Sequence, residues 1–204
     1  RYYCNNLKTI YVSDNFVTDR VSYSEYMFSG DNQLKGSYGT TYNSSHTDDE
    51  YARIDSVNTP GYFSETGVNI VRYYPNGGNL NNQYREITIG DSLGTLPTPT
   101  NGDNEFVGWY TKIVGGEEIT SEYIPTEYTE LYARWKFEIK FNANGGTVDT
   151  SQIDVYSGQT IGTLPTPTRE GFGFVGWYTG LTDGVKISGN RIITDSATYY
   201  AHYL

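Results

Sequence analysis

Two stretches of sequence decide the fold: Gly94-Thr95-Leu96-Pro97-Thr98-Pro99-Thr100 and Phe106-Val107-Gly108-Trp109-Tyr110-Thr111. Both return unchanged 68 residues later, as residues 162–168 and 174–179. Repetition at a fixed offset is the sequence signature of a duplicated structural unit. The second half of the chain is therefore predicted to contain the same unit twice.

Two further blocks obey the same offset. Asn76-Gly77-Gly78 recurs as Asn144-Gly145-Gly146, and Tyr132-Ala133 recurs as Tyr200-Ala201. Four blocks in one register, without a gap, exclude a chance similarity. We expect repeat modules at residues 68–135 and 136–204, preceded by a different segment at residues 1–67.

Alternating side chains predict strands within each copy. Phe137, Ile139 and Phe141 alternate with polar residues, which places the apolar set on one face. Further strands are expected at residues 153–156, 174–178 and 198–203. Asn-Gly-Gly allows a tight reversal, because these residues tolerate positive φ. Leu-Pro-Thr-Pro-Thr must be an ordered crossing segment, because each proline lacks an N–H.

Composition agrees with a mostly β chain. The 204 residues include 23 Gly and 21 Tyr, and an aromatic share of 16% is too high for a disordered segment. The formal charge of −10 argues against nucleic acid and against an anionic membrane surface, since either partner requires clustered basic residues. No apolar run is long enough to span a membrane.

The tryptophans Trp109 and Trp177 admit two interpretations. A module of this size has little Leu or Met, so its aromatic residues are expected to fill the core. Exposed Trp and Tyr could instead stack on sugar rings. Burial of Trp109, Tyr110, Trp177 and Tyr178, or their presence along a groove, would distinguish the two interpretations.

The first 67 residues have a different texture. Leu7, Ile10, Val12 and Phe16 are spaced like a turn of a leucine-rich solenoid. The string from Met27 to Leu34 restates Cys4-Asn5-Asn6-Leu7 at an offset of 27, so that Asp31 matches Cys4. After Leu34 the periodicity ends in a polar, Tyr-rich run. We expect the last turns of a solenoid and its cap, since terminal repeats are atypical.

The repeated motifs resemble the Listeria-Bacteroides (internalin B-type) repeat. The resemblance rests on Asn-Gly-Gly, Ile161-Gly162-x-Leu164-Pro165-x-Pro167, the stretch Gly171 to Tyr178, Lys186-Ile187-Ser188 and Tyr200-Ala201, and it covers about two thirds of the chain. It implies two tandem small β-grasp (ubiquitin-like) modules, of a kind found as stalks in surface proteins. The first copy departs from the pattern at residues 102–105.

The first segment resembles the C-terminal end of a BspA-like leucine-rich repeat array. There Met-Phe-x-Gly-Cys-x-x-Leu recurs, and Asp31 stands in the place of the usual Cys. The stretch from Tyr51 to Phe63 is similar to the segment that closes such an array. A short leucine-rich-repeat terminal cap is therefore expected before the modules.

No pattern of residues indicates catalysis, a cofactor or a metal site. His202 occupies the place of Arg134 in the first copy, and Cys4 lies at a position that Asp31 also fills. Asp48-Asp49-Glu50 lacks the alternating ligands of a calcium loop. The candidate residues are therefore structural: Gly77, Gly78, Pro97, Pro99, Gly108, Trp109, Tyr110, Gly145, Gly146, Pro165, Pro167, Gly176, Trp177 and Tyr178.

These observations predict a non-catalytic fragment of a bacterial cell-surface protein. Its stalk or adhesion modules would present a leucine-rich binding region to a host or bacterial surface protein or glycan. The alternative is a carbohydrate-binding module of a secreted protein. The chain begins at Arg1 without a signal peptide, which is typical of a fragment or mature product. We expect an extracellular monomer.

Overall fold

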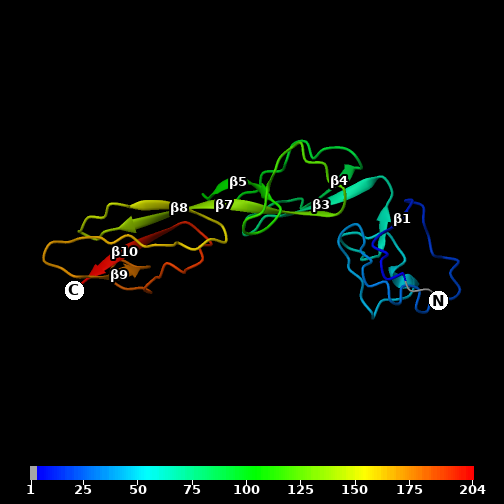
Figure 1. The fold of residues 1–204 in the computed structure, drawn as a ribbon, viewed down its shortest axis with the longest axis horizontal. Coiled ribbons are helices and arrows are strands. Elements are labelled where there is room, and N and C mark those ends of the chain that lie inside the picture. Colours follow the sequence, from blue (N-terminus) through cyan, green and yellow to red (C-terminus); the bar gives the residue numbers. More distant parts are fainter. Residues whose placement is uncertain (1–3) are drawn as a thin grey trace. The chain divides into compact units, whose positions relative to one another are not determined.

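The computed structural model describes residues 4–204, and these residues form mostly β-structure (Figure 1). Within them lies one short 3-10 helix, η1 (Asp49–Tyr51), and no α-helix. The strands are β1 (Ile10–Val12), β2 (Phe63–Glu65), β3 (Val68–Tyr74), β4 (Tyr84–Thr88), β5 (Glu105–Tyr110), β6 (Glu118–Ile119), β7 (Thr129–Asn142), β8 (Gln152–Tyr156), β9 (Phe174–Tyr178) and β10 (Ala197–Tyr203). The strands expected in the second copy are confirmed.

The chain divides into two compact units. The first contains residues up to 72, 82–96 and 121–130. The second contains residues 73–81, 97–120 and 131–204. Strands β3 and β7 each contribute residues to both units.

The first unit begins with two passes of chain that repeat the same hydrogen bonds. Leu7 N donates to Cys4 O, and Leu34 N donates to Asp31 O, 27 residues later. The passes also contact each other at the same offset, since the Lys35 N–H donates to Lys8 O at 2.9 Å. The Cys4 N–H donates to the Asp31 carboxylate at 3.2 Å.

A small apolar core lies beneath these passes. It consists of Phe28, Leu34, Ala52, Tyr62 and Phe63, with Leu7, Ile10, Val12, Tyr42 and Tyr51 packed against it. Strand β1 pairs with β2 in parallel, from Ile10 opposite Phe63 to Val12 opposite Glu65. Residues near the start and the end of the segment therefore share one core.

A buried carboxylate fixes the loops of the first unit. Asp55 is fully buried and accepts hydrogen bonds from Tyr38 N, Thr40 N, Thr40 Oγ1 and Gly61 N. A buried charge is stabilised only when its oxygens are satisfied in this way. The unit also contains β4, which pairs antiparallel with β3 from Val68 opposite Thr88 to Arg72 opposite Tyr84.

Strand β7 organises the second unit (Figure 1). Its fourteen residues alternate between buried and partly exposed positions from Leu131 to Phe141, as expected for a strand with one face on a core. Its first half pairs antiparallel with β5, and its second half pairs antiparallel with β8. One strand thus ends the first copy and begins the second.

The second copy has a mixed sheet with a parallel central pair. Strand β10 runs parallel to β7, from Ala197 opposite Ile139 to Tyr200 opposite Asn142, and antiparallel to β9. The order across the sheet is β8-β7-β10-β9. The first copy repeats it as β4-β3-β7-β5.

The same register positions are buried in both copies. These pairs differ by 68 in number, and every member is at most 6% exposed: Val71 and Ile139, Tyr73 and Phe141, Ile87 and Val155, Leu93 and Ile161, Trp109 and Trp177, Ile119 and Ile187, Leu131 and Tyr199, Ala133 and Ala201. The hydrophobic pattern of the duplication is therefore a pattern of burial.

Side chains also join the two copies within the second unit. Lys136 pairs with Glu105, and the Trp135 N–H donates to Ser157 Oγ at 3.2 Å. Asn104 donates to the Asp195 carboxylate at 2.8 Å. These contacts supplement the covalent continuity of β7.

Candidate functional site

The repeated Trp and Pro residues form one hydrogen-bonded unit in each copy. Trp109 Nε1 donates to Pro97 O at 2.8 Å, and Trp177 Nε1 donates to Pro165 O at 2.7 Å. Both tryptophans are 1% exposed, so neither offers a ring face to a ligand. The indole lies in the core while its N–H fixes the crossing segment, which agrees with the packing interpretation.

The crossing segment is attached to the turn that follows the first strand of each copy. Asn79 and Thr100 exchange backbone hydrogen bonds of 2.7 and 3.0 Å, and Thr147 and Thr168 exchange bonds of 2.7 and 2.8 Å. The second proline of each motif, Pro99 or Pro167, is buried. Prolines suit this segment because they need no hydrogen-bond acceptor for a backbone N–H.

The Asn-Gly-Gly turn is required by its backbone and by its surroundings. Asn76 and Asn144 have φ of 48° and 49°, and the glycines Gly77 and Gly145 that follow them have φ of 94° and 84°. Asparagine and glycine occupy this region at the lowest cost. The asparagine side chains donate to Ala133 O and Ala201 O, each at 3.0 Å.

The second glycine of this turn leaves room for an aromatic ring that sequence reasoning missed. A Cβ on Gly78 would lie 2.4 Å from Trp135 Cζ2, and one on Gly146 would lie 2.5 Å from the Tyr203 hydroxyl oxygen. Trp135 Nε1 donates to Pro75 O at 2.9 Å, and Tyr203 Oη donates to Ala143 O at 2.8 Å. The signal was available, because positions 135 and 203 also differ by 68.

The conserved Tyr of each copy lies on the other face of the sheet. Tyr110 is half-buried beneath the Arg134 guanidinium, 3.4 Å from the ring centroid. Tyr178 is stacked on His202, with centroids 4.0 Å apart and planes 7° apart. Arg134 also donates to Gly115 O, and His202 Nε2 lies 2.9 Å from Gly180 O. In each copy a nitrogenous side chain thus covers the tyrosine ring and reaches the following loop.

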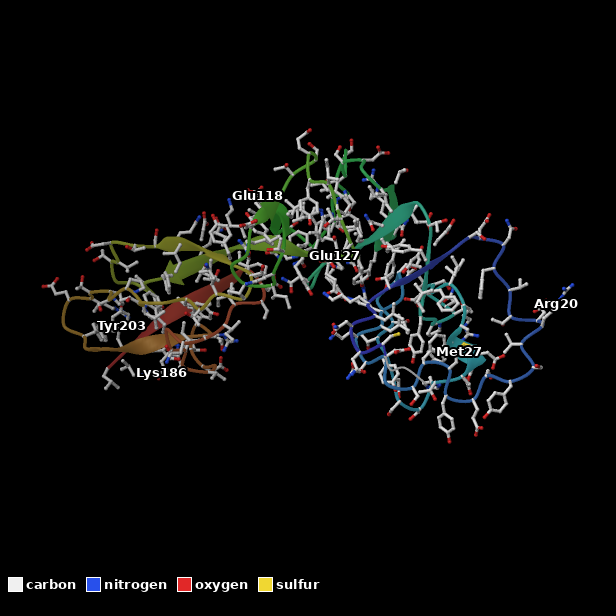
Figure 2. All side chains as sticks on the ribbon, turned by 45° about the vertical axis from the view of Figure 1, so that its right-hand side comes forward. Arg20, Met27, Glu118, Glu127, Lys186 and Tyr203 are labelled. Carbon is white, nitrogen blue, oxygen red and sulfur yellow. The ribbon has the colours of Figure 1, made fainter. Side chains whose placement is uncertain are left out.

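Gly108 and Gly176 lie beside a second variable pair, Glu118 and Lys186, both labelled in Figure 2. A Cβ on Gly108 would lie 3.1 Å from Glu118 Oε1, and one on Gly176 would lie 2.4 Å from Lys186 Cε. Lys186 Nζ donates to Val175 O at 2.7 Å. The glycine is retained because a long side chain crosses it, whatever the charge of that side chain.

The chemically reactive residues do not converge. Cys4 is exposed, and His46 is stacked on Tyr51 with ring centroids 4.3 Å apart. Across residues 4–204 no group of three or more His, Cys, Asp or Glu side chains could hold a metal ion. No helix in the described part of the chain has the length and apolar character needed to cross a membrane.

The chain is similar to several known proteins. It is 30% identical over 127 residues to internalin H of Listeria monocytogenes, covering 57% of this chain and 22% of the relative. It is 29% identical over 123 residues to a provisionally named membrane protein of Evansella cellulosilytica, covering 56% of this chain and 18% of the relative. The chain thus spans about a fifth of the length of these curated relatives. No solved structure is significantly similar to it.

The family comparison matches the repeated part of the chain. The sequence model of the Listeria-Bacteroides repeat domain matches residues 70–134 and 137–202, which is more than half of the chain. The two matched ranges are the two copies whose tryptophans, prolines and turn glycines occupy equivalent positions. The chain therefore belongs to the Listeria-Bacteroides repeat domain family, with two tandem copies.

Proposed function

We propose that this chain is a non-catalytic part of a bacterial cell-surface protein, in which two repeat modules form a stalk for a leucine-rich binding region. The proposed domains are residues 1–67, 68–135 and 136–204. The protein is extracellular and monomeric, and its partner is a surface protein or a glycan. Similarity to an internalin and to a provisionally named membrane protein supports this location.

Each module is proposed to be a β-grasp unit. The sheet order β8-β7-β10-β9, in chain order second, first, last, third, supports this proposal, as does the parallel pairing of the first and last strands. A loop containing the Leu-Pro-Thr-Pro-Thr segment makes the crossover that a helix makes in ubiquitin-like folds. The indole-to-proline hydrogen bond holds this loop against the sheet.

The first segment is proposed to be the end of a leucine-rich repeat array with its cap. Hydrogen bonds repeated at an offset of 27 support this proposal, together with the direct bond from Lys35 N to Lys8 O at that offset. Stacked solenoid turns contact each other between equivalent residues. The polar run with η1 and the buried Asp55 would then form the cap.

The observation that carries the stalk role is the parallel pairing of β7 and β10. Strand β7 begins the second module and β10 ends it, so tension along the chain pulls these neighbours in opposite directions. Their hydrogen bonds must then break together and not one after another. Such a module resists extension more than one opened from a strand end.

Pulling a single chain from its two ends tests this role. We expect two large unfolding steps, each releasing about 65 residues, which corresponds to roughly 230 Å of extended chain at ~3.6 Å per residue. Thr198→Pro removes an N–H from β10 beside β7. It should weaken one of the two steps and leave the other unchanged, which makes the first module an internal control. Gradual extension without steps would exclude the stalk role.

The alternative function, a carbohydrate-binding module, loses its most obvious platforms. Trp109 and Trp177 are buried, and one face of each conserved tyrosine is covered by Arg134 or His202. Stacking on a sugar needs an accessible ring face. A sugar site on this chain must therefore be built from other residues.

A further inference from the structure

The first unit contains a polar cavity that the repeat motifs do not use. Its volume is about 180 Å³, and it is lined by residues of the first segment, of strand β3 and of the loop that precedes β7. The lining includes Lys8, Lys35, Tyr11, Tyr128, Asn69 and Glu127. All of these residues belong to the same compact unit. Glu127 is labelled in Figure 2.

Two lysines are brought to this cavity by the 27-residue offset. The Lys35 N–H donates to Lys8 O, so the two side chains leave neighbouring passes of the chain. Lys35 Nζ lies 4.3 Å from the Tyr128 ring centroid, while Lys8 is exposed. The ion pairs of the described residues involve Lys136 and Lys140, and neither cavity lysine takes part in them.

Placing two cations side by side is unfavourable without a counter-charge, and the chain as a whole carries −10. An anion between the two amines would remove this repulsion. Hydroxyl and amide groups also line the cavity, among them the nearly buried Ser64 and Asn69, and Asn69 is fixed by donation to Pro125 O at 2.8 Å. Polar groups held in this way favour a ligand that is rich in hydroxyls.

Glu127 and the tyrosines narrow the class of ligand. A phosphate dianion would be repelled by the Glu127 carboxylate, whereas a sugar hydroxyl can donate a hydrogen bond to it. Tyr11 is 51% exposed and offers a ring against which a pyranose can pack. We infer that this cavity binds one acidic sugar residue of the hexuronate class, with its carboxylate between Lys8 and Lys35. This inference rests on the proposed role of the first segment as the binding region.

Titration of the chain with glucuronate, followed by two-dimensional amide NMR, tests the inference. We expect saturable shifts at residues 8–11, 33–37 and 127–128, weaker shifts with glucose 6-phosphate, and none with glucose. Raising the salt concentration should weaken binding, because one partner, Lys8, is exposed to solvent. Lys8→Gln should reduce the affinity about tenfold, which corresponds to the ~1.4 kcal/mol expected for one charge-assisted contact.

Matched variants keep the result interpretable. Lys112→Gln removes an equally exposed charge in the second unit and should bind glucuronate like the original chain. Lys35→Gln should also weaken binding, and its melting curve shows whether the first unit still folds. Binding that is unaffected by Lys8→Gln, equal for glucose, or tighter for glucose 6-phosphate would overturn the inference. The pulling experiment does not depend on this cavity, so either proposal can fail alone.

Discussion

Replacing Trp177 with alanine should unfold the second module while the rest of the chain stays folded. The side chain is 1% exposed, packs against Phe141 and Phe174 with centroids 4.9 and 5.7 Å away, and donates to Pro165 O. Loss of a buried Trp costs roughly 3–5 kcal/mol. The lost hydrogen bond adds about 1 kcal/mol.

This loss is comparable to the whole stability of the module. The family match assigns residues 137–202 to the second copy, and a unit of this size has a free energy of unfolding of roughly 3–10 kcal/mol. Amide hydrogen exchange read by mass spectrometry separates the copies. Peptides from β9 and β10 should lose protection, whereas peptides from β3 and β4 should keep theirs.

A matched control separates packing from any general effect of truncation. Leu181→Ala removes an apolar side chain that is 50% exposed in the same copy, and we expect its effect to stay within about 0.5 kcal/mol. Trp109→Ala should give the reciprocal result, with loss of protection in the first copy. Unchanged protection of β9 and β10 in Trp177→Ala would refute the assignment of the repeated Trp as the core anchor.

Three further predictions concern other residues. Gly78→Ala should destabilise the first copy by about 1–3 kcal/mol in urea denaturation, since its Cβ would overlap the Trp135 ring, and a neutral result would show that the turn can move. Asp55→Ala should unfold the first unit by leaving buried donors unpaired, which loss of NMR dispersion in residues 28–63 would reveal. Burial and the hydrogen bond to Glu86 raise the pKa of Tyr38 from 10.0 to about 12, so its stabilising contribution is complete below pH 10 and declines as the pH rises toward 12. Carbon NMR of the tyrosine rings should show this pKa falling in Glu86→Gln.

The sequence predicted the repeated part of the fold well because its signals are local. A period of two, obligatory turns and an offset of 68 identify strands and their buried faces without any knowledge of contacts. The predicted strand at residues 174–178 coincides with β9, and the predicted strand at 198–203 lies within β10. The single strand β7 follows from the absence of any turn residue between Trp135 and Phe137.

The cavity could not be predicted from the same kind of signal. Its walls come from residues 8–11, 33–37, 64–70 and 127–128, and convergence of distant segments leaves no periodic trace in a sequence. The offset of 27 placed Lys35 beside Lys8, but it gave no information about Tyr128 or Asn69. The hydrogen bond from Trp135 to Pro75 was missed for a simpler reason, because its partner in the second copy is Tyr203 and not another Trp.

The two copies differ most where the fold constrains them least. Positions that donate to a crossing segment or fill the core keep their chemistry, even when Trp135 is replaced by Tyr203. On the open face Arg134 corresponds to His202, and Glu118 corresponds to Lys186 with opposite charge. A charge reversal at equivalent, exposed positions changes the local surface potential without disturbing the buried hydrogen bonds. Duplication of this module therefore yields a constant scaffold whose exposed face can acquire different contacts in each copy.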